Sequence, residues 1–297
     1  RNTPMLANLR LARWFGWSGA SDSLWMASLR PILDSRELDS TPAHVRHVYV
    51  RDPDLACWYR RAFGRTADDP RDNDTTVLVN SGKALAAFQE TLVTGRTPFD
   101  DYRDALARGD RLAAAKYPDS AARGLMIFIG RGNCVLCHSG PNFSNAEFHS
   151  TGIGHFTARG RADGGRFEGI EAVTTNAFNL LSKFNDDALR ANATHTRNVV
   201  LAPRNWGEFR TPSLRNVAVT APYMHNGGLA TLRDVLQHYS ELDEERLHAD
   251  GEKLLRALKL SDAETEDLLA FLNTLTDKHG ADRPRPVPLY VDCDATF

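Results

Sequence analysis

Two cysteines and a histidine form the pattern with the clearest chemistry, because residues 134–138 read Cys-Val-Leu-Cys-His. Two thiols at this spacing can each form a thioether to a haem vinyl group, and the adjoining histidine can bind the iron. A zinc site needs further Cys or His ligands at close spacing, whereas Cys57 and Cys293 are single and remote. We therefore interpret Cys134 and Cys137 as the attachment site of a haem c, with His138 as the proximal iron ligand.

Composition and charge limit the other classes of function. The 297 residues allow two domains with substantial cores. The net charge of -2 and the pI of about 6.6 provide no polybasic surface, so we expect no nucleic-acid partner. No apolar run approaches the roughly 20 residues of a membrane span. Covalent haem attachment takes place outside the cytoplasm, so we predict a periplasmic protein, where Cys57 and Cys293 form a disulfide or remain two thiols.

Helices are the elements predicted to position this motif, because apolar residues recur at helical spacing through most of the chain. Between residue 140 and about residue 208 the periodicity fails, and the glycine-rich runs there lack the pattern of a phosphate-binding loop. A loop around the edge of a cofactor is the better interpretation. The fold class is all-α, with a boundary near Tyr117-Pro118. The expected helices cover 5–13, about 21–33 (capped by Ser21 or Asp22), a short stretch from Thr41-Pro42, 54–63, 77–93, 99–107, 120–130, 231–239 and 261–275 (opened by the capping box Ser261 to Glu264).

Six segments, in chain order, resemble the bacterial di-haem cytochrome c peroxidase and MauG family. The resemblance implies two cytochrome c-like haem domains with long loops, residues 1–117 and 118–297. Members carry two C-x-x-C-H motifs, the first upstream of Arg-Asn-Thr-Pro. This chain has one, so we expect the N-terminal, peroxidatic domain to have been cut before its haem-attachment segment, which would supply a second haem c. The segments are Arg-Asn-Thr-Pro (1–4), Phe-Gly-Trp-Ser-Gly (15–19), Pro31 with Arg-Glu-Leu (36–38), 84–92, 209–217 and 220–227.

The resemblance also implies ligands for the C-terminal haem. Tyr239 falls where the peroxidases have a methionine ligand and MauG-like members have tyrosine. Met224 and His238 are the alternatives. A phenolate oxygen is a hard anionic donor that favours ferric and higher iron states. Arg210 is expected to pair with a haem propionate, since its guanidinium group matches a carboxylate.

Four further positions bear on catalysis. Trp17 corresponds to the family's tryptophan between the two haems, where an indole can pass an electron. Glu37 corresponds to the distal acid, which takes a proton from peroxide and returns it to the departing oxygen. Pro31 would shape the same pocket. Ala27 stands where the family has glutamine, which puts a peroxidase-type distal network in doubt.

A calcium ion is the second cofactor that the resemblance implies. Asn2, Thr220 and Pro222 match the positions that hold calcium between the haems. One side-chain amide and two backbone carbonyl groups suit this hard cation, with water completing its shell.

These residues together imply an enzyme of the MauG-like branch. Hydrogen peroxide would oxidise the haem facing Glu37, and long-range electron transfer would then oxidise a substrate, for example a side chain of a partner protein. Two alternatives stay open. One is a cytochrome c peroxidase that takes electrons from a small redox protein, a cytochrome or a cupredoxin. The other is a monohaem electron-transfer cytochrome, which would follow if the single C-x-x-C-H motif reflects the whole protein.

Overall fold

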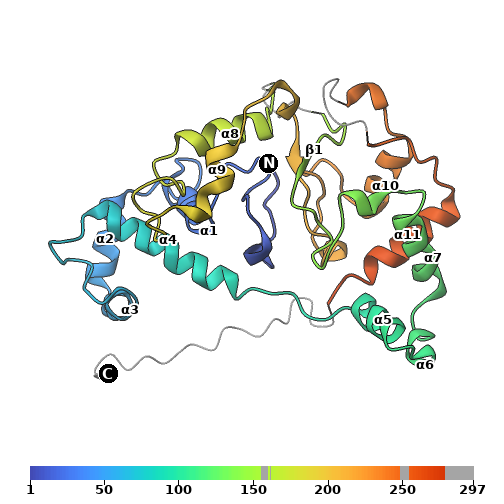
Figure 1. The fold of residues 1–297 in the computed structure, drawn as a ribbon, viewed down its shortest axis with the longest axis horizontal. Helices are drawn as coiled ribbons and strands as arrows, with labels where there is room; N and C mark the ends of the chain where they lie inside the picture. Colours follow the sequence, from blue (N-terminus) through green and yellow to red (C-terminus); the bar gives the residue numbers. More distant parts are fainter. Residues whose placement is uncertain (155–159, 161, 248–253, 278–297) are drawn as a thin grey trace.

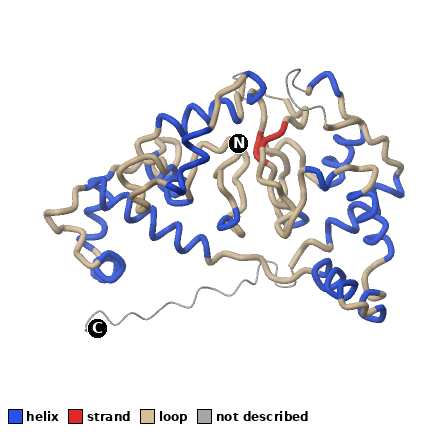
Figure 2. Tube along the Cα trace, in the orientation of Figure 1, coloured by secondary structure: helices blue, strands red, loops and turns tan. Residues whose placement is uncertain are grey.

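Helices and long loops make up almost all of the protein (Figures 1 and 2). The structure is a computed structural model that describes residues 1–154, 160, 162–247 and 254–277. Its two short antiparallel strands, β1 (Phe148–His149) and β2 (Phe209–Arg210), pair with each other. The predicted all-α class is therefore confirmed. The α-helices are α1 (Leu24–Leu33), α2 (Pro42–Arg51), α3 (Pro53–Phe63), α4 (Asp74–Glu90), α5 (Pro98–Ala107), α6 (Arg111–Ala114), α7 (Asp119–Ile129), α8 (Arg166–Thr175), α9 (Thr194–Asn198), α10 (Leu232–Ser240) and α11 (Asp262–Asn273).

Two lobes are visible in Figure 1, and the N-terminus lies between them. The first lobe contains α1–α4, α8 and α9, and the second contains α5–α7, α10 and α11. The core of the first lobe is built on Trp14, Trp25 and Leu29, and Val173 of α8 packs into it. The chain thus returns to the first lobe after it has entered the second. The predicted boundary at residue 117 stays a prediction.

The second lobe has an aromatic core. Phe128 of α7 and Phe271 of α11 lie 5.0 Å apart between ring centroids, and both rings meet Phe143. Gly124 allows α7 to approach α11 closely, because a Cβ atom there would lie 1.9 Å from the Asp267 carbonyl oxygen. Pro118 is the residue before α7. The residue before it, Tyr117, forms a hydrogen bond between its hydroxyl group and that of Thr274 (2.7 Å).

Local capping explains where several helices begin. Thr41 caps α2, with proline at its first position, and Thr97 and Thr231 form capping boxes at α5 and α10. The predicted capping box of Ser261 and Glu264 opens α11. At α1 the cap is Ser23, not Ser21 or Asp22 as predicted, because the Asp22 carboxylate is used elsewhere.

The predicted helix over residues 5–13 is wrong, and only a 3-10 turn over Leu9–Leu11 forms there. Asn8 takes a left-handed conformation (φ 62°) because tertiary contacts hold it. Its backbone N–H donates to the Leu92 carbonyl oxygen (2.8 Å), and its side chain exchanges hydrogen bonds with Thr94. The segment is thereby attached to the end of α4 and cannot continue as a helix.

Three helices occur where none was predicted, namely α6, α8 and α9. The sequence of α8 has little amphipathic pattern because Gly169 lies on its packed side. A Cβ atom at Gly169 would lie 1.9 Å from the Ser18 carbonyl oxygen. Cys57 of α3 is disulfide-bonded, and Cys293 lies outside the described residues, so their pairing stays a prediction. No helix among the described residues is long and apolar enough to cross a membrane.

Candidate haem-binding site

The C-x-x-C-H motif lies in a tight turn just after α7. A 3-10 turn covers Cys134–Leu136, and the His138 backbone N–H donates to the Cys134 carbonyl oxygen (2.8 Å). Before it, the Gly132 N–H bonds back to Ile127 (2.9 Å), which fixes the exit from α7. Neither Cys134 nor Cys137 forms a disulfide, so both sulfur atoms are available for thioether formation.

A hydrogen bond at Nδ1 orients the His138 ring, so that the opposite nitrogen, Nε2, is the one that can bind a metal. The Nδ1 atom lies 3.0 Å from the Phe143 carbonyl oxygen, which can only accept, so Nδ1 carries the proton. Burial lowers the pKa of His138 to about 4, so the ring is neutral and Nε2 keeps its lone pair. An imidazole oriented by a backbone carbonyl group on its far nitrogen is the usual arrangement of a histidine ligand.

A buried ion pair holds the loop that positions His138. Arg215 donates two hydrogen bonds to the Asp100 carboxylate (2.7 and 2.9 Å) and a third from Nε to the Pro141 carbonyl oxygen (2.7 Å). Both side chains are buried. The loop between Pro141 and Phe143 is thereby clamped to α5, so Arg215 acts on His138 through Phe143.

Tyr239 is the candidate ligand that lies within electrostatic range of the haem cysteines. Burial raises the pKa of its phenol above the usual range, and the charges of Cys134 and Cys137 add to the shift. Its helix, α10, packs through Leu236 into the core cluster against which Cys134 also packs. The His238 Nε2 atom instead forms a hydrogen bond with the Thr151 carbonyl oxygen (2.8 Å).

Met224, the other alternative, lies in a turn of the loop before α10. It has φ 66°, and its carbonyl oxygen accepts from the Gly227 N–H (3.2 Å). Tyr239 as the iron ligand, with Met224 and His238 as alternatives, therefore stays a prediction.

A second group of predicted residues meets at the N-terminus, between the lobes. The Trp17 indole N–H donates to the Asn2 carbonyl oxygen (2.7 Å), and the Asn2 side-chain amide lies 2.6 Å from the Pro222 carbonyl oxygen. The Asn2 backbone N–H donates to the His225 carbonyl oxygen (2.7 Å). Thr220 is exposed two residues before Pro222. The structure thus joins Trp17 to two of the three predicted calcium positions.

Arg210 links this group to the haem motif. Its backbone N–H donates to the Trp17 carbonyl oxygen (2.8 Å), and its Nε to that of Gly16 (3.1 Å). Its strand, β2, pairs with β1 just after the motif. Burial lowers the pKa of Arg210, and no carboxylate within the described part of the chain forms an ion pair with it. A buried guanidinium in this state suits an anionic group of a ligand.

Glu37 and Pro31 lie together at the C-terminal end of α1. The Leu38 N–H donates to the Pro31 carbonyl oxygen (3.1 Å), so the turn with Glu37 folds back on the helix. The Glu37 side chain is exposed. Ala27 packs against the first-lobe core, one turn before Pro31. Within the described part of the chain, no hydrogen bond or ion pair joins Glu37 to Trp17.

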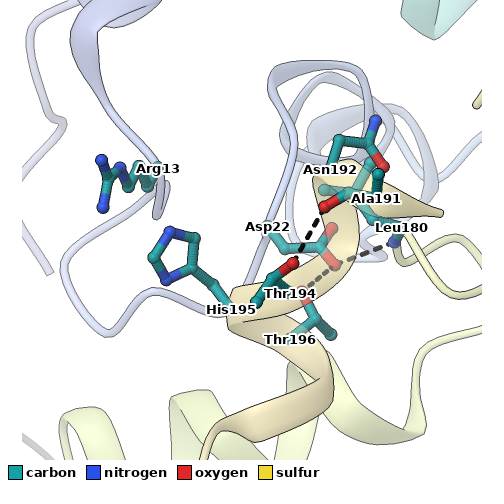
Figure 3. Close-up of a pocket in the computed structure, with 8 residues that line it drawn as sticks. All are labelled: Arg13, Asp22, Leu180, Ala191, Asn192, Thr194, His195 and Thr196. Atoms are coloured by element: carbon teal, nitrogen blue, oxygen red, sulfur yellow. Dashed lines mark hydrogen bonds between the residues drawn. The ribbon is translucent and has the colours of Figure 1, made fainter.

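A pocket of about 350 Å³ lies elsewhere in the first lobe (Figure 3). Asp22 is buried at its edge and accepts from the Leu180 N–H (2.8 Å) and the Thr196 hydroxyl (2.6 Å). Arg13 and His195 also line it. None of the predicted site residues lines it.

The residues around the motif fit a covalently attached haem. They provide two thiols, a neutral imidazole, a phenol within electrostatic range of both thiols, and a partly buried arginine. The predicted calcium position offers amide and carbonyl oxygens, and the described residues contain no cluster of three or more carboxylate, histidine or cysteine ligands.

Comparison with known proteins decides the family. The family model for di-haem cytochrome c peroxidase matches residues 1–108. The cytochrome-c peroxidase IdrP1 of Pseudomonas sp. strain SCT is 32% identical over 283 residues, which cover 93% of this chain and 68% of that protein. The chain belongs to the di-haem cytochrome c peroxidase family. The methylamine utilization protein MauG of Methylorubrum extorquens is also similar, with 31% identity over 93% of this chain. The chain spans 64% of that protein's length.

Solved structures of this family share the fold. The diheme peroxidase BthA of Burkholderia thailandensis has a TM-score of 0.69 at 21% identity, covering 97% of this chain and 75% of that one. A MauG-like protein associated with microbial copper homeostasis has a TM-score of 0.66 at 24% identity, covering 94% and 76%.

Sequence reasoning missed the residues that support the ligands. Phe143, Arg215 and Asp100 hold His138, and Arg166 of α8 holds the loop that carries Trp17. Arg215 lies inside the 209–217 segment that resembles the family, but no role was inferred for it. Asp100 was not singled out, because it lies inside the predicted helix over residues 99–107. Their pairing spans 115 positions, and no sequence signal reports it.

Proposed function

We propose that this chain is the major part of a periplasmic di-haem c-type oxidoreductase of the MauG type. Hydrogen peroxide is its oxidant, and a side chain of a partner protein is its reductant. The proposal includes a second haem c, in keeping with the di-haem family. The family relatives named peroxidase and MauG support the use of hydrogen peroxide.

The observation that carries the proposal is that α10, the helix of Tyr239, packs through Leu236 into the same core cluster as Cys134, with Tyr239 within electrostatic range of both thiols. His138 and the Tyr239 phenolate would favour ferric and higher oxidation states of a bound haem iron, whereas a methionine ligand would raise the reduction potential and suit electron delivery. Bound haem supplies a centre that stores oxidising equivalents. The chain's own residues then fix its ligands and shield it from water.

The remaining site residues have defined tasks in this proposal. Arg210 pairs with a propionate, and Trp17 passes electrons between the two haem sites. Glu37 takes the first proton of the peroxide and returns it to the departing oxygen, in a pocket that Pro31 helps to shape. Asn2, Thr220 and Pro222 hold calcium through oxygen atoms. The contact of Asn2 with both Trp17 and Pro222 would couple the ion to the indole.

A cytochrome c peroxidase that takes electrons from a small cytochrome or cupredoxin is the second candidate. The similarity to IdrP1, which is named a cytochrome-c peroxidase, favours it. Tyr239 distinguishes the two, because a peroxidase of this kind needs a high-potential haem to accept the donor's electrons. A monohaem electron-transfer cytochrome is the third reading, and intact mass separates it from both.

The test combines spectroscopy with replacement of Tyr239. We expect the natural full-length protein to contain two haems, one high-spin and one low-spin, without a methionine-to-iron charge-transfer band. Tyr239→Met is expected to create that band and to raise the midpoint potential of the low-spin haem.

Tyr223→Phe is the matched control. Tyr223 is also partly buried, but its hydroxyl donates to the Val217 carbonyl oxygen (2.9 Å), away from the motif. Its replacement should leave potential and spectrum unchanged. A methionine band in the wild type, or an unchanged spectrum in Tyr239→Met, would contradict the proposal. A single haem would leave the monohaem reading.

A further inference from the structure

Three tryptophans lie close together in the sequence of the first lobe, and only one is assigned to electron transfer. Trp14 and Trp17 share one loop, and Trp25 begins the next helix. Indoles have the same intrinsic ease of oxidation, so their surroundings must decide which one loses an electron. The structure gives the three rings different electrostatic surroundings.

Trp14 is covered by a buried cation. The guanidinium carbon of Arg166 lies 4.1 Å from the Trp14 ring centroid and 4.0 Å from that of Phe148. Arg166 is 4% exposed and donates to the Ser18 and Gly19 carbonyl oxygens (3.3 and 3.0 Å). Glu147 and Glu208 lie within electrostatic range. No carboxylate in the described residues forms an ion pair with it.

Trp25 also has a cation over its ring, but at a longer distance. The Lys83 ammonium lies 5.9 Å from its ring centroid, and Asp186 forms an ion pair with that ammonium. The carboxylate offsets part of the lysine charge, so Trp25 feels less of it than Trp14 feels of Arg166.

Trp17 has a different environment, in which the Arg210 guanidinium bonds to the neighbouring Gly16 carbonyl oxygen. Within the described chain no cation lies over its ring, and its N–H donates to the Asn2 carbonyl oxygen (2.7 Å). Such an acceptor stabilises the indole when it is positively charged. A carbonyl group does not take the proton, so the oxidised indole keeps its N–H.

We propose that Arg166 is a selectivity residue that confines one-electron oxidation to Trp17 by making Trp14 hard to oxidise. The inference rests on the proposed function. In the step concerned, Trp17 gives one electron to the cofactor oxidised by hydrogen peroxide, keeps its proton, and regains an electron from the substrate. A cation attracts the face of a neutral indole but repels the same ring once it is positive.

Oxidation products of the three tryptophans test the selection. The full-length holoprotein is treated with hydrogen peroxide without substrate, and peptide mass spectrometry measures oxidised Trp14, Trp17 and Trp25. In the wild type we expect Trp17 to dominate. Arg166→Met should raise the Trp14 yield by about tenfold or more, because a charge about 4 Å away is removed. Arg166→Lys keeps the charge and should stay near the wild type.

Two further measurements separate charge from packing. Acrylamide quenching of tryptophan fluorescence reports any gain in solvent exposure in Arg166→Met. The fold-increase in the yield of oxidised Trp14 must exceed the fold-increase in quenching. Lys83→Met is the control, because Asp186 already offsets the Lys83 charge. It should change the yield of oxidised Trp25 much less than Arg166→Met changes that of Trp14. Equal Trp14 yields in Arg166→Met and Arg166→Lys, or no rise in either, would overturn the proposal.

An external photogenerated one-electron oxidant repeats the comparison without the haems. If it oxidises Trp14 more in Arg166→Met than in Arg166→Lys while peroxide leaves Trp17 intact in the wild type, the selection stands and the proposed electron route fails. If peroxide oxidises Trp17 but Arg166 has no effect with either oxidant, the route stands and the selection fails.

Discussion

Asp100 shows how a single side chain supports the haem site from a distance. It neutralises Arg215, and both are buried behind the loop that holds His138. Asp100→Asn keeps the shape but leaves the guanidinium charge without its partner. We expect a loss of about 3–5 kcal/mol in the free energy of unfolding, measured by denaturant titration of the full chain.

Asp101→Asn on the same helix is the matched control. Asp101 pairs with Arg96 at the surface (3.1 Å), and such pairs contribute about 0–1 kcal/mol. Equal losses in the two variants would show that burial of the Asp100 pair adds nothing.

Acid titration gives a second prediction for Asp100. Burial alone would raise its pKa, but the hydrogen bonds from Arg215 and Thr97 outweigh burial and hold the pKa well below its usual range. Because the unfolded chain takes up the proton first, near pH 3.9, this stabilisation is complete above that pH and is lost as the pH falls below it. The stability difference between wild type and Asp100→Asn should therefore shrink below about pH 4. A difference that stays constant to pH 2 would contradict the ion-pair explanation.

At the level of elements, the contact between α7 and α11 depends on a missing side chain. In an exposed helix, Gly→Ala adds about 1 kcal/mol of stability. Gly124→Ala should instead destabilise the protein by about 1–3 kcal/mol, because the new methyl group meets the Asp267 carbonyl oxygen and the Phe271 Cβ atom. Thermal unfolding of the full chain measures the effect.

Gly154→Ala is its control, since a Cβ atom there meets nothing within 4 Å. Its melting temperature should match that of the wild type. A Gly124→Ala variant as stable as the wild type would mean that α7 and α11 can separate without cost.

The sequence predicted those elements whose signals are local. Thr41-Pro42 and the Ser261–Glu264 box mark helix starts through contacts within four residues. Residues 5–13 and α8 were mispredicted because distant partners decide them. Asn8 is held by Leu92 and Thr94, and α8 is held by the approach of Gly169 to Ser18.

The same distinction applies to the site. The thiols and His138 follow from one pentapeptide, whereas Tyr239, Trp17 and Glu37 came from family resemblance alone. The supporting residues Arg215 and Arg166 donate hydrogen bonds to backbone carbonyl oxygens. Every residue has such an oxygen, so the amino-acid type of the partner is not constrained. Such contacts leave no pattern in a single sequence.

At the scale of the whole molecule, Asp22 ties the returning segment to the first lobe. It accepts hydrogen bonds from Leu180 and from Thr196 of α9, which both belong to the segment between α8 and β2. Asp22→Ala removes both acceptors and should expose residues 176–198 to proteolysis. We expect cleavage there at least several-fold faster, measured by limited trypsin digestion and mass spectrometry, because cleavage rates follow local opening.

Asp243→Ala, at an exposed site in the second lobe, should leave that cleavage rate unchanged. Uniformly faster cleavage along the Asp22→Ala chain would point to global unfolding. Unchanged cleavage at 176–198 would mean that Asp22 does not anchor the segment.

The pairing of α7 with α11 also sets an order of events during biosynthesis. Arg123 and Asp267, which join the two helices, are 144 positions apart, and the thiols lie close behind α7. While the polypeptide is still emerging, α7 has no partner, so the turn around Cys134 and Cys137 remains open chain. Maturation of the cofactor site can therefore be complete before the second lobe closes. Among the described helices α11 emerges last, so its packing on α7 would follow attachment of the cofactor.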